Sequence, residues 1–532
     1  MTDVPTLTSA TQANYAVMNP LSLGSTVTLS NGNLTMTEGG TYATTVSSIS
    51  MTSGKWYAEM TVGSNTYAGT IGIAKLGYSP TSRLGFQANT WSYNNDGGLY
   101  YNSATLAVVS SYTTGDVIGI AFDATNLTIA FYKNNTLQTT QYTAANSGLT
   151  AGEFYFATGH INSTSNWNFG QRPFAYTAPT GFKALCTQNL PQPTIQKPST
   201  AMDVVTYTGN GSNGRVISGL NFSPDLVWTK SRSAAYDHAL SDTVRGVGFA
   251  LHSNTTAAED TSYGLSGVGA GNYTINAVNQ LNENTTTYVA WSWKAGSTTS
   301  TNTYGSITST VRANPQAGFS IVSYTGNGTA GATVGHGLGV APKMIIVKNR
   351  ITAGFDWVTY HQNMNASPQG GYVSLNSTIA FTSNTGIWNN VAPSSSVFTL
   401  GTNTAVNKNA EGHIAYCFSE IEGYSKFGSY TGNGSSDGPF VWCGFRPRWV
   451  MYKRADLTEN WAILDSARDV SNVVGNQLTP NSSSAEGTGS SNIDIVSNGF
   501  KMRSATAGGN VSNGTYIFAA FAESPFKYAR AR

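Results

Sequence analysis

The strongest constraint on the fold is an internal repeat. The segment Val204-Val-Thr-Tyr-Thr-Gly-Asn-Gly211 returns as Ile321-Val-Ser-Tyr-Thr-Gly-Asn-Gly328 and again as Phe427-Gly-Ser-Tyr-Thr-Gly-Asn-Gly434. Asn and Gly tolerate the positive φ angles of tight turns, so each copy predicts a strand that ends in such a turn. Three copies at this spacing predict three modules of roughly 100 residues, which is an ordinary domain size.

Further anchors follow each copy in the same order. The first is a proline with an apolar strand that ends in a lysine, at Pro224–Lys230, Pro342–Lys348 and Pro447–Lys453. The last is an apolar closing strand, at Tyr288–Trp293, His413–Phe418 and Tyr516–Phe521. The closing strands are apolar on both faces, which indicates central strands of a sandwich. We therefore expect three tandem β-sandwich-like modules at residues 201–296, 297–426 and 427–532.

Composition agrees with an all-β fold and excludes some functions. Charged residues make up 10% of the 532-residue chain, against about 25% in ordinary soluble domains. Solubility must then come from Ser, Thr, Asn and Gly, which favour turns and strands over helices. The net charge is only +2, and nucleic-acid affinity depends on many phosphate contacts. We therefore expect no nucleic-acid partner.

The chain carries no sign of export or membrane insertion. Its three cysteines do not make a disulfide framework and suit a reducing cytoplasm. The first residues lack a basic and apolar leader, and no apolar run is long enough to span a bilayer. A protein with an adhesin-like surface and no leader fits synthesis in a host cytoplasm, assembly into a particle and release by lysis.

The region before the modules has its own pattern of short strands. Gly54–Val62 alternates apolar and polar residues, and similar segments follow at sandwich spacing. We expect a β-sandwich over residues 21–188, preceded by an arm at residues 1–20. Prolines in residues 189–200 fix φ and remove donors, which predicts an extended, semi-rigid linker.

Residues 50–175 resemble the SPRY (B30.2) family. The resemblance rests on five segments in order: Gly54-Lys-Trp-Tyr-Ala-Glu59, Ile71-Gly-Ile-Ala74, Gly115-Asp-Val-Ile-Gly119, Phe131-Tyr-Lys-Asn-Asn135 and Asn168-Phe-Gly-Gln-Arg-Pro-Phe174. It implies a bent sandwich of two antiparallel sheets that binds partners through loops at one end. The chain departs from the family at Asn134-Asn135, where Asn-Gly is usual, and this affects the expected turn type.

The rest of the chain resembles virion proteins. The segment Phe169–Pro191 is similar to the end of SPRY domains in phage virion proteins, and the modules are similar to those that accompany them in marine podoviruses and cyanophages. This implies a virion structural protein, and we expect a tail fibre that recognises host surface glycan or protein. The expected partners are a tail hub, adaptor or capsid, and a homotrimer is expected by analogy. Residues 1–20 would anchor it, although the opposite polarity is also open.

The motifs that could indicate catalysis do not lie in the sequence context that such a site needs. Residues 209–214 and 326–331 fit G-x-G-x-x-G, but strand-like sequence follows where a dinucleotide site needs a helix. The six histidines lack metal-ligand spacing, and His413 in its apolar strand is expected to be a core histidine. We expect no metal, no cofactor and no catalysis. The alternatives are a capsid fibre or decoration protein, and a polysaccharide depolymerase using Asp237 with Asp242 or Glu411 with Glu420.

The candidate binding residues are aromatic and lie around an Asn-Asp-Gly turn. Aromatic faces stack on sugar rings or peptides, while Asn and Asp supply directed hydrogen bonds. The competing interpretation is that strand alternation buries one residue of each adjacent pair in the core. The residues proposed for receptor or glycan binding are Trp91, Tyr93, Asn94, Asn95, Asp96, Tyr100 and Tyr101.

Overall fold

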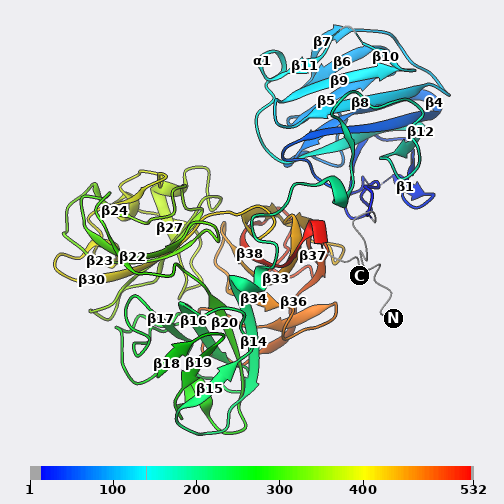
Figure 1. Ribbon diagram of the computed structural model, residues 1–532. Coiled ribbons are helices and arrows are strands. Elements are labelled where there is room, and N and C mark those ends of the chain that lie inside the picture. The colour runs from blue at the N-terminus through cyan, green and yellow to red at the C-terminus, as the bar shows by residue number, and fades with distance from the viewer. Residues whose placement is uncertain (1–12, 25, 139, 529–532) are drawn as a thin grey trace. The chain divides into compact units, whose positions relative to one another are not determined.

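The computed structural model describes residues 13–24, 26–138 and 140–528, and Figure 1 shows their course. Strands hold 43% of the chain and helices 6%, so the predicted all-β fold is confirmed. Two compact units meet between Gln192 and Pro193, inside the segment expected as a linker. Residues 1–12, most of the expected anchor, lie outside the described residues. No helix in the described part of the chain is long and apolar enough to cross a bilayer.

The unit that ends at Gln192 is a bent antiparallel sandwich built on two long strands. Strand β4 (Lys55–Lys75) pairs with β12 (Phe154–Asn168) along most of its length. The first residues of β4 pair with β8 (Val117–Asp123), whereas its last residues pair with β5 (Thr90–Asn94). The sheet therefore bends along β4, and the remaining strands extend the two ends (Figure 1).

Both faces of the first half of β4 are covered, although its sequence alternates. Trp56 and Met60 enter the core as the alternation predicts, but Tyr57 and Glu59 are buried as well. The chain after β12 covers the outer face: Phe174 packs edge-on against Tyr57 at 5.0 Å between ring centroids. The buried Glu59 carboxylate accepts hydrogen bonds from two backbone amides of that segment, so its burial is compensated.

The other elements of this unit are short. They are β1 (Val27–Ser30), β2 (Thr35–Glu38), β3 (Ala43–Val46), β6 (Gly98–Tyr101), β7 (Ala104–Val108), β9 (Thr128–Lys133), β10 (Thr136–Leu137), β11 (Tyr142–Thr143), α1 (Ala144–Ser147), β13 (Lys183–Ala184) and η1 (Thr187–Asn189).

In the unit that begins at Pro193, each of the three expected module ranges contains four strands in one order. The order is β14-β20-β16-β17 in the first module, β23-β30-β25-β26 in the second and β31-β38-β33-β34 in the third. The closing strands β20, β30 and β38 lie between two neighbours, so their predicted central position is confirmed. Each repeated Tyr-Thr ends a strand, as predicted, and the turn then leads the chain to a different sheet.

The elements of this unit follow in chain order. The short helix η2 (Pro198–Thr200) lies in the range expected as the linker. In the first module range the elements are β14 (Met202–Thr208), β15 (Arg215–Ser218), β16 (Leu226–Ser231), β17 (Ala239–Asp242), β18 (Gly267–Gly269), β19 (Asn272–Ile275), α2 (Asn279–Asn282) and β20 (Thr287–Trp293). In the second they are β21 (Ser300–Asn302), β22 (Ser309–Asn314), β23 (Phe319–Thr325), β24 (Ala332–Gly335), β25 (Met344–Asn349), β26 (Val358–His361), η3 (Pro368–Gly370), β27 (Gly371–Ser374), β28 (Thr382–Ser383), α3 (Thr385–Trp388), β29 (Val397–Leu400), α4 (Thr404–Asn407) and β30 (Gly412–Phe418). In the third they are β31 (Ser425–Thr431), β32 (Phe440–Trp442), β33 (Phe445–Arg454), β34 (Trp461–Asp465), β35 (Val474–Gln477), β36 (Gly487–Val496), β37 (Gly499–Met502), β38 (Thr515–Pro525) and η4 (Phe526–Tyr528).

One hydrophobic core joins all three modules. The last aromatic residues of the closing strands, Trp293, Phe418 and Phe521, meet at its centre. Their ring centroids are separated by 6.4 Å, 5.7 Å and 5.9 Å, so each ring contacts the other two. Residues at one position of the repeat thus converge on one point. The three expected module ranges lie in one compact unit and share this interior.

Buried lysines link the modules in a cycle. The strands β16, β25 and β33 carry Lys230, Lys348 and Lys453 at the same position, and all three are fully buried. Each ammonium donates to a carbonyl of another module, namely Lys230 to Ser483 (3.1 Å), Lys348 to Thr256 (3.2 Å) and Lys453 to Thr378 (3.1 Å). The first module thus reaches the third, the second reaches the first and the third reaches the second. This pattern is that of a closed ring.

Candidate binding site

The seven candidate residues lie on two neighbouring strands and the turn between them, but not on one face. Strands β5 and β6 pair antiparallel, with Trp91 opposite Tyr101 and Tyr93 opposite Leu99. Because side chains alternate along a strand, Trp91, Tyr93 and Tyr101 share one face, whereas Ser92 and Tyr100 share the other.

The inner face holds core residues. Trp91 and Tyr93 are 5% and 0% exposed. The Trp91 indole donates to the Ser147 carbonyl at 2.9 Å, and the Tyr93 hydroxyl donates to the Ser110 carbonyl. The half-buried Tyr101 packs edge-on against Tyr142. Trp91 and Tyr93 therefore present no ring face to a partner.

The side chains of the turn residues mainly form hydrogen bonds to neighbouring groups of the same turn. Asn94 is buried, and its Oδ1 accepts from Ser92 Oγ at 3.0 Å. Asp96 is exposed, and its Oδ1 accepts the Gly98 amide at 2.8 Å. Asn95 is half-buried. Of these three residues, Asp96 is the one with an exposed charge.

The outer face carries a column of flat groups that we call the Arg83 stack: Tyr42, Arg83, Phe86 and Tyr100. The Arg83 guanidinium carbon lies 3.9 Å from the centroid of Phe86 and 5.0 Å from that of Tyr42. Phe86 also contacts Tyr100, with 4.6 Å between ring centroids and 35° between ring planes. Tyr42 is 37% exposed and the other three are partly exposed. The stack therefore combines one cation with aromatic surface.

The loop that carries Arg83 and Phe86 is held firmly. Leu84 between them is fully buried. Gly85 has φ +83°, and a Cβ there would lie 2.1 Å from Ser92 Oγ, so the turn requires glycine. The Gln87 side chain bonds both the amide and the carbonyl of Ser79. The positions of the stack are therefore set before any ligand arrives.

Tyr100 is placed by a second glycine and by Asp96. A Cβ at Gly98 would lie 2.2 Å from the Tyr100 ring, so the ring rests on bare backbone. The Tyr100 hydroxyl donates to Asp96 Oδ2 at 3.4 Å. Partial burial, and then the Asp96 carboxylate, raise the pKa of Tyr100, while Arg83 opposes the shift. The hydroxyl stays protonated at neutral pH and can donate.

Sequence reasoning found Tyr100 and Asp96 but missed Tyr42, Arg83 and Phe86. These three residues belong to segments far from the Asn-Asp-Gly turn, and nothing in their spacing links them to it. Arg83 is the one charged residue between Lys75 and Asp96. This lone charge was the feature of the sequence that could have indicated a functional role for Arg83.

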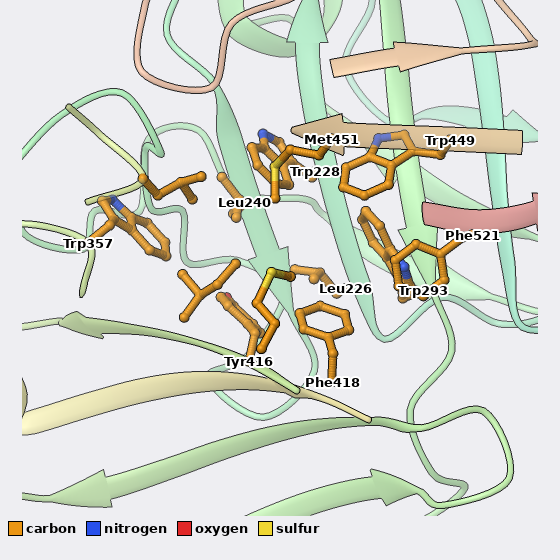
Figure 2. A pocket seen from close by; sticks show the side chains of 13 residues that line it. Leu226, Trp228, Leu240, Trp293, Trp357, Tyr416, Phe418, Trp449, Met451 and Phe521 are labelled. Atoms are coloured by element: carbon orange, nitrogen blue, oxygen red, sulfur yellow. The ribbon is translucent and has the colours of Figure 1, made fainter. Parts of the chain in front are cut away.

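The module unit encloses an apolar cavity of about 20 Å³ at the shared core. Figure 2 shows side chains from all three modules, among them Trp293, Phe418 and Phe521, turned towards this space. Every lining residue is hydrophobic, and a water needs polar partners as well as roughly 10–15 Å³. The cavity is therefore a packing gap where three modules meet, too small for a substrate.

The acids considered for catalysis have structural partners. Asp242 is buried against Arg245 and accepts from the Tyr416 hydroxyl at 2.8 Å. Asp237 accepts from the amide of Asn254. Glu411 pairs with Lys408, and Glu420 pairs with Lys426.

The histidine prediction is confirmed. His413 is fully buried and stacks on Tyr324 at 5.1 Å. Burial lowers its pKa to about 4. Among the described residues, no group of three or more His, Cys, Asp or Glu side chains is arranged to hold a metal ion. Cys186, Cys417 and Cys443 are buried, and none of the three forms a disulfide.

Comparison with known proteins identifies two regions. A family model described as "Domain of unknown function (DUF7483)" matches residues 197–525, and the SPRY domain model matches residues 55–172. No curated protein matches the chain.

Solved SPRY structures are similar to the first unit. The SPRY domain of human HERC1 is 19% identical, with a TM-score of 0.26, and the match covers 29% of this chain and 99% of that one. The TRIM65 PSpry domain is 12% identical, with a TM-score of 0.25, covering 29% and 90%. A human SPRY domain is 16% identical, with a TM-score of 0.23, covering 28% and 98%. The family model shows that the chain carries a SPRY domain at residues 55–172.

Proposed function

We propose that this chain, which belongs to the DUF7483 family and carries a SPRY domain before that region, is a bacteriophage virion structural protein that acts as a tail-fibre component and binds the host receptor. The receptor is a cell-surface glycan or protein. The chain is made in the host cytoplasm, joins the particle through a tail hub or adaptor, and leaves by lysis. Neither family description names an activity, so the support comes from the residues of this chain.

The observation that carries the proposal is the Arg83 stack. It places Arg83 and three aromatic side chains at the surface of the SPRY unit, on a loop fixed by Leu84 and Gly85. Preformed contact groups strengthen receptor binding, because side chains that are already ordered lose less entropy on binding. Aromatic rings and arginine are also the groups enriched where binding energy concentrates.

In this proposal the DUF7483 region is the structural part of the protein. We infer that its three ranges are tandem modules of common origin. The equal strand orders, the cycle of buried lysines and the convergence of three closing strands favour this inference. A ring closed by a shared core resists local opening, which suits a protein exposed outside the cell.

Copy number would raise the strength of attachment. We propose that several copies act together, with a homotrimer as the first expectation. Weak single contacts become strong when linked copies engage one surface, because each further contact is intramolecular. Sedimentation of the purified chain measures the copy number directly.

Two alternatives remain. A capsid fibre or decoration protein would carry the same two units on the head. A polysaccharide depolymerase would need a pair of free carboxylates across a sugar groove. Asp242 and Glu411 are already engaged by cations, which makes them weak candidates.

Cryo-electron microscopy of the whole particle, with antibodies against this chain, tests the proposal. We expect density for the chain on the tail, and we expect the antibodies to block adsorption. Labelling of heads without loss of adsorption would replace the proposal with the decoration protein. Release of oligosaccharides from host envelope glycan by the purified chain would replace it with the depolymerase.

A further inference from the structure

Arg83 differs from most described arginines in having no acceptor. Arg245, for example, is fully buried and bonds the carboxylates of Asp242 and Glu259. Arg83 Nε is buried without a hydrogen-bond partner, and no carboxylate pairs with the guanidinium among the residues that the structure describes. Its contacts are the faces of Tyr42 and Phe86. Arg83 is partly exposed, so water reaches part of its guanidinium, and an acceptor on a ligand can replace that water without breaking an existing ion pair.

The geometry of the unpaired group selects the acceptor. A guanidinium is planar and presents its N–H donors in a fixed fork, which matches the two oxygens of a carboxylate. The ring centroids of Phe86 and Tyr42 lie 3.9 Å and 5.0 Å from the guanidinium carbon, and these two contacts restrict the position of the Arg83 side chain before binding. The ligand should therefore carry an anionic group of that shape.

The surroundings indicate what carries that anionic group. Tyr100 packs at a tilt against Phe86 and is partly exposed, and exposed aromatic surface packs against the C–H face of a sugar ring. The exposed Asp96 carboxylate beside the Tyr100 hydroxyl accepts hydrogen bonds from hydroxyl groups. The same carboxylate repels polyanions, which disfavours nucleic acid and peptides rich in acidic residues.

We propose that the Arg83 stack binds an acidic saccharide, with the sugar carboxylate on Arg83 and the sugar ring against Tyr100. This rests on the proposed host attachment and deepens it by naming the ligand class. The ligand is a sugar with one carboxylate per recognised unit, such as a uronic acid, and its neighbouring hydroxyls bond Asp96.

A saccharide array tests the proposal with the full chain. The probes are carboxylated oligosaccharides, each beside its neutral methyl ester, with acidic peptides on the same surface. We expect at least one carboxylated saccharide to bind about tenfold more tightly than its ester. Arg83→Gln should remove that preference, and Tyr100→Ala should weaken binding of the acid and the ester alike. Arg172→Gln, at an exposed arginine of the same unit, is the control and should bind like the wild type.

Three outcomes would overturn the site: no preference for any acid over its ester, equal binding by Arg83→Gln, or selective binding of the acidic peptides. Thermal unfolding of each variant excludes loss of fold as the cause. Competition with phage for host cells separates the two proposals. If the wild type and Arg83→Gln compete equally, the proposal of host attachment is supported and the proposed saccharide site is refuted. If neither protein competes, but the preference for the carboxylated saccharide over its ester depends on Arg83, the saccharide site is supported and the proposal of host attachment is refuted.

Discussion

At the scale of single residues, the repeated turns depend on an asparagine that the repeat itself does not include. Asn282, Asn407 and Asn510 each lie six residues before the first aromatic position of a closing strand, and all are buried. Asn407 Oδ1 accepts the Asn327 amide at 2.9 Å. The other two accept the equivalent amides at 3.0 Å and 2.8 Å. Each asparagine therefore clamps one Thr-Gly-Asn-Gly turn.

Replacing Asn407 by alanine tests the clamp. The Asn407 amide also donates to the carbonyls of Thr329 and Gly401, so the change leaves several backbone groups without partners. We expect a loss of about 2–3 kcal/mol, because unpaired buried polar groups cost about 1–3 kcal/mol each and partly relax. Urea unfolding measures it. The exposed Asn409→Ala is the control, and an equal effect of both changes would refute the clamp.

His361 gives the module unit an acid-sensitive position. Its Nε2 bonds the Phe518 carbonyl at 3.1 Å, and its Nδ1 accepts the Asn363 amide at 3.2 Å, so both nitrogens are used by the neutral ring. Burial lowers the pKa of His361 to about 4, although the bond to Phe518 opposes the shift. The unfolded chain takes up this proton near its ordinary pKa of about 6.5.

Stability should therefore fall as pH drops from about 6.5 to 4, since only the unfolded chain gains the proton. The loss from His361 should approach about 3 kcal/mol at pH 4. Buried His238 and His413, whose pKa values are also lowered mainly by burial, add losses of the same sign. Urea unfolding at pH 7, 5 and 4 checks this, and His361→Gln should show a shallower decline. An unchanged slope in that variant would contradict the assignment.

At the scale of elements, the three contacts between modules follow one plan with one exception. Glu259 bridges Arg245 and Arg350 between the first and second modules. Glu486 bridges Arg468 and Arg232 between the third and first modules. At the remaining contact the corresponding residues are Met364, Phe381 and Ala455, which join the hydrophobic core. An ionic bridge and an apolar contact thus occupy equivalent positions. This is expected because the free-energy cost of removing charges from water offsets most of the attraction between them, so that a buried ion pair is little more stabilising than an apolar contact.

Glu486→Gln tests the ionic bridge. The change leaves the fully buried Arg468 with one carboxylate, Asp465, and removes the carboxylate from Arg232. We expect a loss of about 3–5 kcal/mol, the usual cost of removing one member of a buried charge group. Chemical unfolding of the variant measures it. Asn409→Ala, at an exposed position, should change stability by less than about 0.5 kcal/mol. A similarly small effect at Glu486 would mean that water compensates the arginines.

At the scale of the whole molecule, the sequence predicted elements better than their assembly. The strands and central positions were predictable because apolar runs and Asn-Gly turns are local signals. The meeting of Trp293, Phe418 and Phe521 was not, since it depends on how three modules pack. The candidate site was also predictable only in part. Tyr100 lies beside a turn that the sequence predicts, whereas Arg83 is brought close to that turn only by the folding of the chain. Alternation did explain why Trp91 and Tyr93 belong to the core.

The shared core predicts how the chain unfolds. Phe521 contacts Trp293 and Phe418 of the other modules and Trp449 of its own. Its removal should therefore weaken all three modules together, by about 3–5 kcal/mol for a buried aromatic ring. Calorimetry of the wild type should show two transitions, one for each compact unit. Phe521→Ala should lower one transition as a whole, and Phe122→Ala, in the SPRY unit, should lower the other. A third transition in Phe521→Ala, with two modules unaffected, would show that the modules fold independently and that the shared core contributes little.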